Sequence, residues 1–164
     1  GQVFHRCYGL ETIGLRYFNV FGPRQDPQGA YAAVIPKFIH LLKSDQVPMI
    51  NGDGEYSRDF TYVDNIVQGN IRALSMTTAD SSSKSPFGRA YNIGAGGRVT
   101  LNQLYQALQK AVGVEIPPLY GPHRPGDIPH SNADISLAQQ TLQYDPEVDF
   151  SEGIQRTVDW FNES

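Results

Sequence analysis

Cysteine is nearly absent from the sequence. Cys7 stands alone among 164 residues, so no disulfide can form within the chain. Long apolar runs are missing as well, and neither a membrane span nor a secretory signal is found. A chain with this composition is expected in a reducing cytoplasm.

Basic residues are also in the minority. The chain has 13 Lys and Arg against 17 Asp and Glu, which gives a formal net charge of −4 at pH 7. Binding along a nucleic-acid backbone or an anionic membrane requires a basic surface. The composition therefore argues against both kinds of partner, and any anion site must be a local cluster of arginines.

Two catalytic motifs are not found. A dinucleotide-binding loop needs glycines at three-residue spacing, and the nearest candidate, residues 94–97, fails because position 100 is Thr. A tyrosine that transfers a proton is assisted by a lysine four residues later on the same helix face. None of the nine tyrosines has one, since Tyr105 and Lys110 are five apart. We therefore assign no catalytic residue.

A metal site is not expected either. His123, Asp127 and His130 lie close in sequence. Zinc needs three or four converging ligands, and a proline-rich loop offers no fixed geometry for them.

The order of apolar patterns predicts an α/β fold. The chain is long enough for one domain with a buried core. The continuous apolar run at residues 12–18 suits a strand covered on both faces. Further strands are expected near residues 47–50, 58–62 and 90–93, with a glycine turn at residues 51–54 between the first two.

Helix signals alternate with these strands. A first helix is expected to end at Gly9, and Thr100 with Gln103 forms a capping box for a helix that Gly113 ends. Asp64 is expected to cap another, whose inward side would carry Val67, Asn70, Ile71 and Leu74. Other helices are expected near residues 31–42, 134–142 and 151–161.

Three arginines stand in loops or at strand edges: Arg24, Arg58 and Arg124. A guanidinium group presents a planar fork that matches phosphate oxygens, so Arg58 and Arg124 together would suit a diphosphate. The alternative for any one of them is a surface ion pair.

Five stretches give these residues a context. They are residues 16–19 (Arg-Tyr-Phe-Asn), 31–38 (Tyr-Ala-Ala-Val-Ile-Pro-Lys-Phe), 51–55 (Asn-Gly-Asp-Gly-Glu), 58–60 (Arg-Asp-Phe) and 124–131 (Arg-Pro-Gly-Asp-Ile-Pro-His-Ser). In this order they resemble the motifs of the extended short-chain dehydrogenase/reductase family, most closely its UDP-N-acetylglucosamine/galactosamine 4-epimerase branch. The resemblance implies the C-terminal, substrate-binding portion of an extended Rossmann-type epimerase, without the N-terminal dinucleotide-binding βαβ units.

The resemblance also implies roles for single positions. Contacts to the substrate diphosphate would come from Asn19, Arg58 and Arg124, and Asp127 would accept from a ribose hydroxyl. The uracil pocket would be lined by Ala33, Val34, Lys37 and Phe38, with Met49 and Asn51 beneath uracil and ribose. Tyr17 and Phe18 would lie near the nicotinamide end of the cofactor. Asn19 and Asp127 could instead close turns, and Lys37 could be a solvated helix residue.

Two positions bear on specificity. At Met49 the branch is expected to carry an aromatic residue that stacks on the base, so uracil contact would be weaker here. At Ser131, relatives that accept only non-acetylated hexoses carry a bulky Tyr. A small Ser leaves room for an N-acetyl group, although an ordinary surface serine remains the alternative.

The functional expectation follows from this resemblance. In the intact relatives, NAD oxidises the UDP-hexose at C4 and returns hydride to the other face. This chain would supply only the grip on the UDP-sugar, with no activity and no NAD bound to it alone. Residues 1–30 would be a remnant of the cofactor domain, and residues 31–164 the substrate-binding domain.

Partners and alternatives remain open at this point. The resemblance implies a homodimer built from two helices per subunit, one of them residues 2–8, so self-association or pairing with a missing N-terminal half is expected. Other candidates are a fragment of a UDP-glucuronate decarboxylase or of a nucleotide-sugar 4,6-dehydratase, or a stand-alone nucleotide-sugar binding or partner module.

Overall fold

The computed structural model describes residues 1–28, 33–77 and 85–163. Its helices are α1 (Gln2–Tyr8), α2 (Val34–Lys43), α3 (Val63–Leu74), α4 (Leu101–Val112), α5 (Ser136–Leu142) and α6 (Phe150–Glu163). Its strands are β1 (Ile13–Tyr17), β2 (Val20–Phe21), β3 (Met49–Asn51), β4 (Ser57–Arg58), β5 (Thr61–Tyr62), β6 (Arg89–Ile93), β7 (Val99–Thr100) and β8 (Leu119–Gly121). The predicted α/β fold is confirmed. Tyr31, which opens one of the family stretches, lies outside the described residues.

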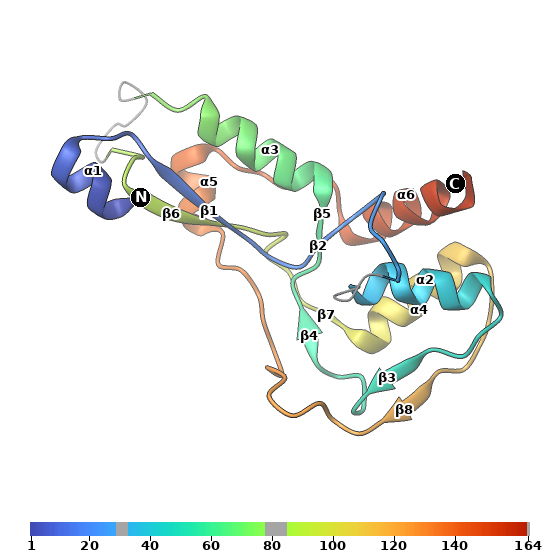
Figure 1. Cartoon of the computed structure of the whole chain (residues 1–164). Helices are drawn as coiled ribbons and strands as arrows, with labels where there is room; N and C mark the ends of the chain where they lie inside the picture. Colours follow the sequence, from blue (N-terminus) through green and yellow to red (C-terminus); the bar gives the residue numbers. More distant parts are fainter. Residues whose placement is uncertain (29–32, 78–84, 164) are drawn as a thin grey trace.

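The first lobe, defined here as α1, β1, α3, β6 and α5, occupies one end of the molecule (Figure 1). β1 and β6 pair in parallel, from Ile13 opposite Arg89 to Tyr17 opposite Ile93. Its core consists of buried side chains from β6, α3, α5 and their flanking loops: Ile66, Tyr91, Ile93, Ala133, Ile135, Ala138, Leu142 and Tyr144.

The second lobe, defined here as α2, β3, α4, β8 and α6, occupies the other end (Figure 1). Its helices bury apolar side chains against one another: Ile35, Phe38, Ile39, Leu42, Leu104, Tyr105, Leu108, Ile154 and Val158. Phe21, Ile50, Phe60, Tyr62 and Val148 complete this core. β3 and β8 pair in parallel along its edge.

Short strands join the lobes. β2 pairs in parallel with β5, β4 pairs antiparallel with β7, and an isolated bridge connects Ser57 with His130. The strands on either side of the turn at residues 51–54 were predicted, but they pair with β8 and β7 rather than with each other. Because β6 pairs with β1, the first lobe contains residues from both sides of position 30. The domain boundary proposed at that position remains a prediction.

Local helix signals are confirmed at both predicted glycine ends. Gly9 and Gly113 close α1 and α4 with left-handed φ angles of 68° and 82°. The capping box is complete, since Thr100 Oγ1 accepts from Gln103 N at 3.1 Å and Gln103 Oε1 accepts from Thr100 N at 2.9 Å.

The predicted inward side of α3 is wrong. Val67, Ile71 and Leu74 are 49%, 57% and 86% exposed, whereas Asn65, Ile66 and Gly69 are buried. A Cβ atom at Gly69 would lie 2.9 Å from Ile93 Cγ2, so the glycine side of the helix approaches β6 closely. Asp64 does not cap the helix. Tyr62 holds the cap position, and Asp64 lies in the first turn.

The expected covering of the first strand is also not met within the described residues. Gly14, Arg16 and Tyr17 of β1 are exposed, and Ile13 and Leu15 are half-buried against the first-lobe core. No helix in the described part of the chain is both long and apolar enough to cross a membrane.

Candidate nucleotide-binding site

A cavity of about 220 Å³ is lined by residues of α2, β3 and α4 in the second lobe, by Arg58 of β4 and by neighbouring loops. The predicted ligand residues that line it come from five separate segments: Asn19, Val34, Asn51, Arg58, Arg124 and Asp127. Residues far apart in the sequence are therefore brought into one place, as the family stretches imply.

A second hollow of about 150 Å³ adjoins this cavity. The two share Asn19, Val34 and Phe60, and the second one adds Ala33. Its wall is apolar, with Phe21 and Ile35 beside Val20. The cavity with the arginines thus has a hydrophobic neighbour, an arrangement that suits a ligand with one charged and one flat apolar part.

The remaining predicted ligand residues do not line either hollow. Phe38 is 4% exposed in the second-lobe core, edge-on to Tyr105 with ring centroids 5.7 Å apart. Lys37 is exposed on α2, and Met49 is 56% exposed on β3. Ser131 is half-buried, and its backbone N–H donates to Ser57 O at 3.1 Å.

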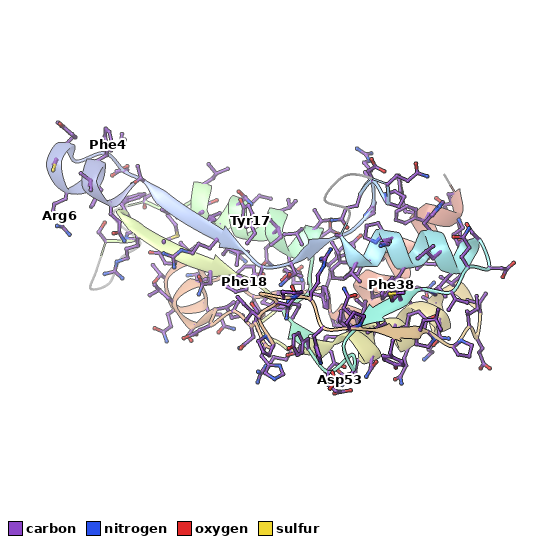
Figure 2. All side chains as sticks on the ribbon, turned by 60° about the horizontal axis from the view of Figure 1, so that its bottom comes forward. Phe4, Arg6, Tyr17, Phe18, Phe38 and Asp53 are labelled. Carbon is purple, nitrogen blue, oxygen red and sulfur yellow. The ribbon has the colours of Figure 1, made fainter. Side chains whose placement is uncertain are left out.

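The two residues predicted near the cofactor lie at the end of β1, between the lobes (Figure 2). Tyr17 is 50% exposed, and its hydroxyl donates to Asn70 Oδ1 of α3 at 2.9 Å. Phe18 is half-buried against the first-lobe core, and its N–H donates to Ile93 O at 3.2 Å. Both roles stay predictions.

Neither arginine of the cavity forms an ion pair with a carboxylate in the described part of the chain. Within the described residues, the recorded ion pairs all belong to Arg156, which pairs with Asp64 and Glu152. Arg58 is half-buried, and its Nη1 donates to Ser57 O at 2.9 Å and to Pro129 O at 3.3 Å. Arg124 is exposed. Their guanidinium charges are therefore available to an anion, which weakens the alternative of simple surface ion pairs.

Asn19 adopts an unusual backbone conformation in the wall of the cavity. Its φ angle is 26°, and its carbonyl accepts from Thr61 N at 3.2 Å, which ties the loop after β1 to β5. Asn tolerates positive φ better than most residues, and such conformations are concentrated at functional sites.

Sequence reasoning missed four lining residues: Tyr56, Phe60, Leu101 and His123. The rings of Tyr56 and His123 lie 4.9 Å apart at an interplanar angle of 32°. The sequence around Phe60 and Leu101 indicates only that these apolar residues pack in a core. Tyr56 and His123 are brought together by the pairing of β3 with β8, which no local pattern reveals.

The glycine-rich turn at residues 94–97 is engaged inside the protein. The N–H groups of Ala95 and Gly96 donate to the buried carboxylate of Asp59 at 2.8 and 3.0 Å. These donors are the groups that a dinucleotide pyrophosphate would need. The turn therefore does not fit a nicotinamide dinucleotide. Across the described ranges, no group of three or more His, Cys, Asp or Glu side chains converges as metal ligands would.

The Asp59 region also affects a buried phenol. Burial raises the pKa of Tyr144, and the neighbouring charges of Asp59 and Asp145 raise it further. The Tyr144 hydroxyl donates to Gly94 O at 2.8 Å. The phenol therefore remains protonated in the folded chain well beyond neutral pH.

A larger groove of about 760 Å³ lies beside the end of α4, lined by Gln106, Gln109, Lys110, residues 113–115 and residues 117–118. It gathers glutamine and proline side chains around one Lys and one Glu. It has no pair of arginines, so the smaller cavity is the better candidate for an anionic ligand.

Solved structures share this fold. One is a UDP-glucose 4-epimerase with UDP-glucose from Thermotoga maritima, at a TM-score of 0.88 and 38% identity over 98% of this chain and 49% of that one. Another is a UDP-N-acetylglucosamine 4-epimerase from Methanobrevibacter ruminantium in complex with UDP-N-acetylmuramic acid, at a TM-score of 0.85 and 42% identity, again over 98% and 49%.

Related sequences carry more than one activity. A UDP-glucose 4-epimerase of Mycolicibacterium smegmatis is 33% identical over 98% of this chain and 48% of its own length. A UDP-N-acetyl-alpha-D-glucosaminuronate decarboxylase of Bacillus cytotoxicus is 32% identical over 94% and 47%. The chain spans about half the length of the curated relatives that it matches.

The sequence pattern of the NAD dependent epimerase/dehydratase family matches residues 2–94, more than half of the chain. This match agrees with the fold and with the related sequences, and it covers the first four of the five stretches. The chain therefore belongs to the NAD dependent epimerase/dehydratase family.

Proposed function

We propose that this chain is the UDP-sugar-binding half of an NAD-dependent UDP-hexose 4-epimerase. The observation that carries the proposal is the meeting of Arg58 and Arg124, neither paired with a described carboxylate, in one cavity. Two guanidinium groups suit a diphosphate, because each can donate two hydrogen bonds to phosphate oxygens. The cavity alone is smaller than most small-molecule sites, which start at about 300 Å³, so the ligand would extend into the hollow beside it.

The other cavity residues fit the rest of a nucleotide. Asp127 is an acceptor for a ribose hydroxyl, and the amide of Asn19 is a donor for the diphosphate. Val34 and Ala33, on the apolar side, would receive the base. Lys37, Phe38, Met49 and Asn51 keep their proposed roles around uracil and ribose. Lys37 and Met49 are exposed outside the cavity, and Phe38 is packed in the second-lobe core.

The reaction itself would need the N-terminal half of the enzyme. NAD held by that half would supply reversible hydride transfer at C4 of the sugar. The residues of this chain would bind and orient the UDP group. Tyr17 and Phe18 would adjoin the cofactor from the end of β1. Alone, the chain would be inactive and would hold no NAD.

For the sugar, we propose an N-acetylated hexose. Ser131 is small and half-buried beside β4, and 42% identity links the chain to a UDP-N-acetylglucosamine 4-epimerase. A second candidate is sugar-acid decarboxylation, because one relative is named as a decarboxylase. Supplying the intact enzyme with UDP-glucuronate and with UDP-N-acetylglucosaminuronate separates the two, since only a decarboxylase would release carbon dioxide from either.

Calorimetric titration of the chain with UDP tests the site. Arg58→Ala and Arg124→Ala should each weaken UDP binding by at least about tenfold, because a charge-assisted hydrogen bond contributes about 1.5–3 kcal/mol. Arg72→Ala, an exposed arginine of α3 outside the cavity, is the matched control and should bind like the parent. If both cavity variants bind UDP as the parent does, the assignment is wrong.

A further inference from the structure

Arg58 lies between two polar residues that are almost fully buried. Ser57 is 4% exposed and Asp59 is 0% exposed, whereas Arg58 itself lines the cavity. Buried polar groups persist when they are hydrogen-bonded. The partners of these two residues therefore show what they hold in place.

Ser57 binds the segment at residues 129–131 through three groups. Its N–H donates to Pro129 O at 2.9 Å, and its carbonyl accepts from Ser131 N at 3.1 Å. Its hydroxyl forms a hydrogen bond of 2.9 Å with His130 Nδ1. Arg58 Nη1 reaches the same Pro129 carbonyl at 3.3 Å, so the guanidinium is fixed against this segment.

Asp59 binds the continuation of this segment at Ala133. Its Oδ2 accepts from Ala133 N and Gly96 N, both at 3.0 Å. Its Oδ1 accepts from Ala95 N at 2.8 Å and from the Thr61 hydroxyl at 3.2 Å. Both side-chain oxygens of Asp59 therefore act as acceptors, each from two donors.

Close packing leaves this arrangement little freedom. A Cβ atom at Gly94 would lie 2.6 Å from Ala133 Cβ and 2.9 Å from Asp59 Oδ2. Residues 129–133 are thus held on both sides of Arg58. They follow directly on the exposed loop that carries Arg124 and Asp127, in which Asp127 N donates to Arg124 O at 3.2 Å.

We infer that Ser57 and Asp59 are positioning residues of the diphosphate site. By fixing residues 129–133 against β4, they set the distance at which Arg124 faces Arg58. The inference rests on the proposed function, because it concerns the two arginines that would bind the diphosphate. Neither residue lines the cavity, so neither is expected to touch the ligand.

The two residues differ in how far they can be changed. In Asp59→Asn an amide NH₂ replaces one carboxylate oxygen and faces backbone N–H groups, so this variant is expected to lose stability. Ser57→Ala removes only the bond to His130 and leaves both backbone bonds. Ser57→Thr keeps the hydroxyl. The comparison of Ser57→Ala with Ser57→Thr is therefore the informative test.

The experiment compares UDP with uridine, each titrated into the chain and followed by NMR. Ser57→Ala should weaken UDP binding about three- to tenfold, the range for one neutral hydrogen bond, and leave uridine binding within about twofold. Ser57→Thr should restore the parent affinity for UDP. In an Arg124→Ala background, Ser57→Ala should have little further effect, since the arginine that it positions is gone.

The control is Asn65→Ala, which also removes buried side-chain bonds, to Val148 O and N at 2.8 and 3.0 Å, but away from the cavity. This variant should lower stability without weakening UDP binding more than uridine binding. Equal losses for both ligands in Ser57→Ala, or full additivity with Arg124→Ala, would overturn the positioning role. A parent chain that does not bind UDP would overturn the proposed function itself, and this inference with it.

Discussion

The imidazole ring of His123 occupies the space that a side chain at Gly52 would need. Gly52 has a left-handed φ of 72°, and a Cβ atom there would overlap the ring. The ring packs against Tyr56 at a tilt, and both rings line the candidate cavity. The glycine turn after β3 thus leaves room for a cavity residue supplied by a distant segment.

Gly52→Ala should displace His123 and weaken UDP binding. The backbone strain of a left-handed alanine costs about 1–2 kcal/mol, and the overlap with the ring adds to it. Gly113→Ala is a matched control, because Gly113 has a similar φ of 82° with nothing near its Cβ position. Chemical denaturation and UDP titration measure the two effects. A Gly52→Ala chain that loses no more stability or affinity than Gly113→Ala would contradict the role of this packing.

How far the sequence predicted this structure depends on how local each signal is. The capping box of Thr100 and Gln103 was found because both partners lie within one turn. The buried face of α3 was not predicted correctly, because the spacing of Val67 and Ile71 shows an apolar side without showing what covers it. The close approach of Gly69 to Ile93 decides the question and depends on tertiary packing.

The same distinction applies to the site. Arg58 and Arg124 stand out as candidates at a strand edge and in a loop, and they do line one cavity. Tyr56 and His123 were missed, because neither matters until β3 and β8 pair. Phe38 shows the reverse case: it belongs to a family stretch, yet here it packs edge-on against Tyr105 in the core.

The isolated chain should show no epimerase activity and retain no NAD. No tyrosine in the sequence has a lysine four residues later, and the turn at residues 94–97 is already bound to Asp59. The measurement is incubation with UDP-N-acetylglucosamine and NAD, followed by separation of the sugar products. Turnover above a heat-inactivated sample would disprove it.

α1 should fray or pack against another copy of the chain. It has no buried residue, and Val3, Phe4 and Tyr8 are 68%, 57% and 78% exposed. A helix of seven residues is unstable without packing. Hydrogen exchange at Gln2–Tyr8 should be fast in dilute samples and slow down at high concentration, while α4, with Leu104 and Leu108 buried, stays protected in both. Strong protection of α1 in a dilute monomer would contradict this expectation.

Stability should fall as the pH rises above about 10, in part because of Tyr144. Burial and the charge of Asp59 raise the pKa of this phenol above its ordinary value of 10.0. Above pH 10 the unfolded chain releases the proton and the folded chain keeps it, so each further pH unit favours unfolding. Tyr144→Phe removes this contribution but also the bond to Gly94 O, which costs about 0.5–1.5 kcal/mol.

Thermal unfolding at pH 8 and pH 10.5 separates these two effects. Tyr144→Phe should be less stable than the parent at pH 8, and its stability should fall by less between pH 8 and pH 10.5. The stability of Tyr8→Phe, a variant on the exposed helix α1, should fall by as much as that of the parent. Buried phenols at Tyr62, Tyr91 and Tyr105 also have raised pKa values, so part of the decline should remain. An unchanged slope in Tyr144→Phe would refute the assignment.

Ser131 should control which sugars are accepted once the chain is fused to the matching cofactor half of a close relative. The fusion should convert UDP-N-acetylhexosamines, and Ser131→Tyr should lower that activity more than activity on UDP-glucose or UDP-galactose. The backbone of Ser131 is bound to Ser57 O, so a tyrosine there cannot readily withdraw from the sugar. Relieving its overlap with an acetamido group would cost about 1–3 kcal/mol, which corresponds to about ten- to a hundredfold in kcat/KM.

Substrates without the acetamido group are the internal control for this variant, because they lack the group that would collide with the ring. Ser131→Ala provides the matched variant, since it removes the hydroxyl and adds no bulk, and it should treat both substrate classes like the parent. The readout is kcat/KM for each sugar on the same fusion protein. Equal losses on both classes in Ser131→Tyr would mean that the residue affects folding or UDP binding in general, and its role beside the sugar would have to be abandoned.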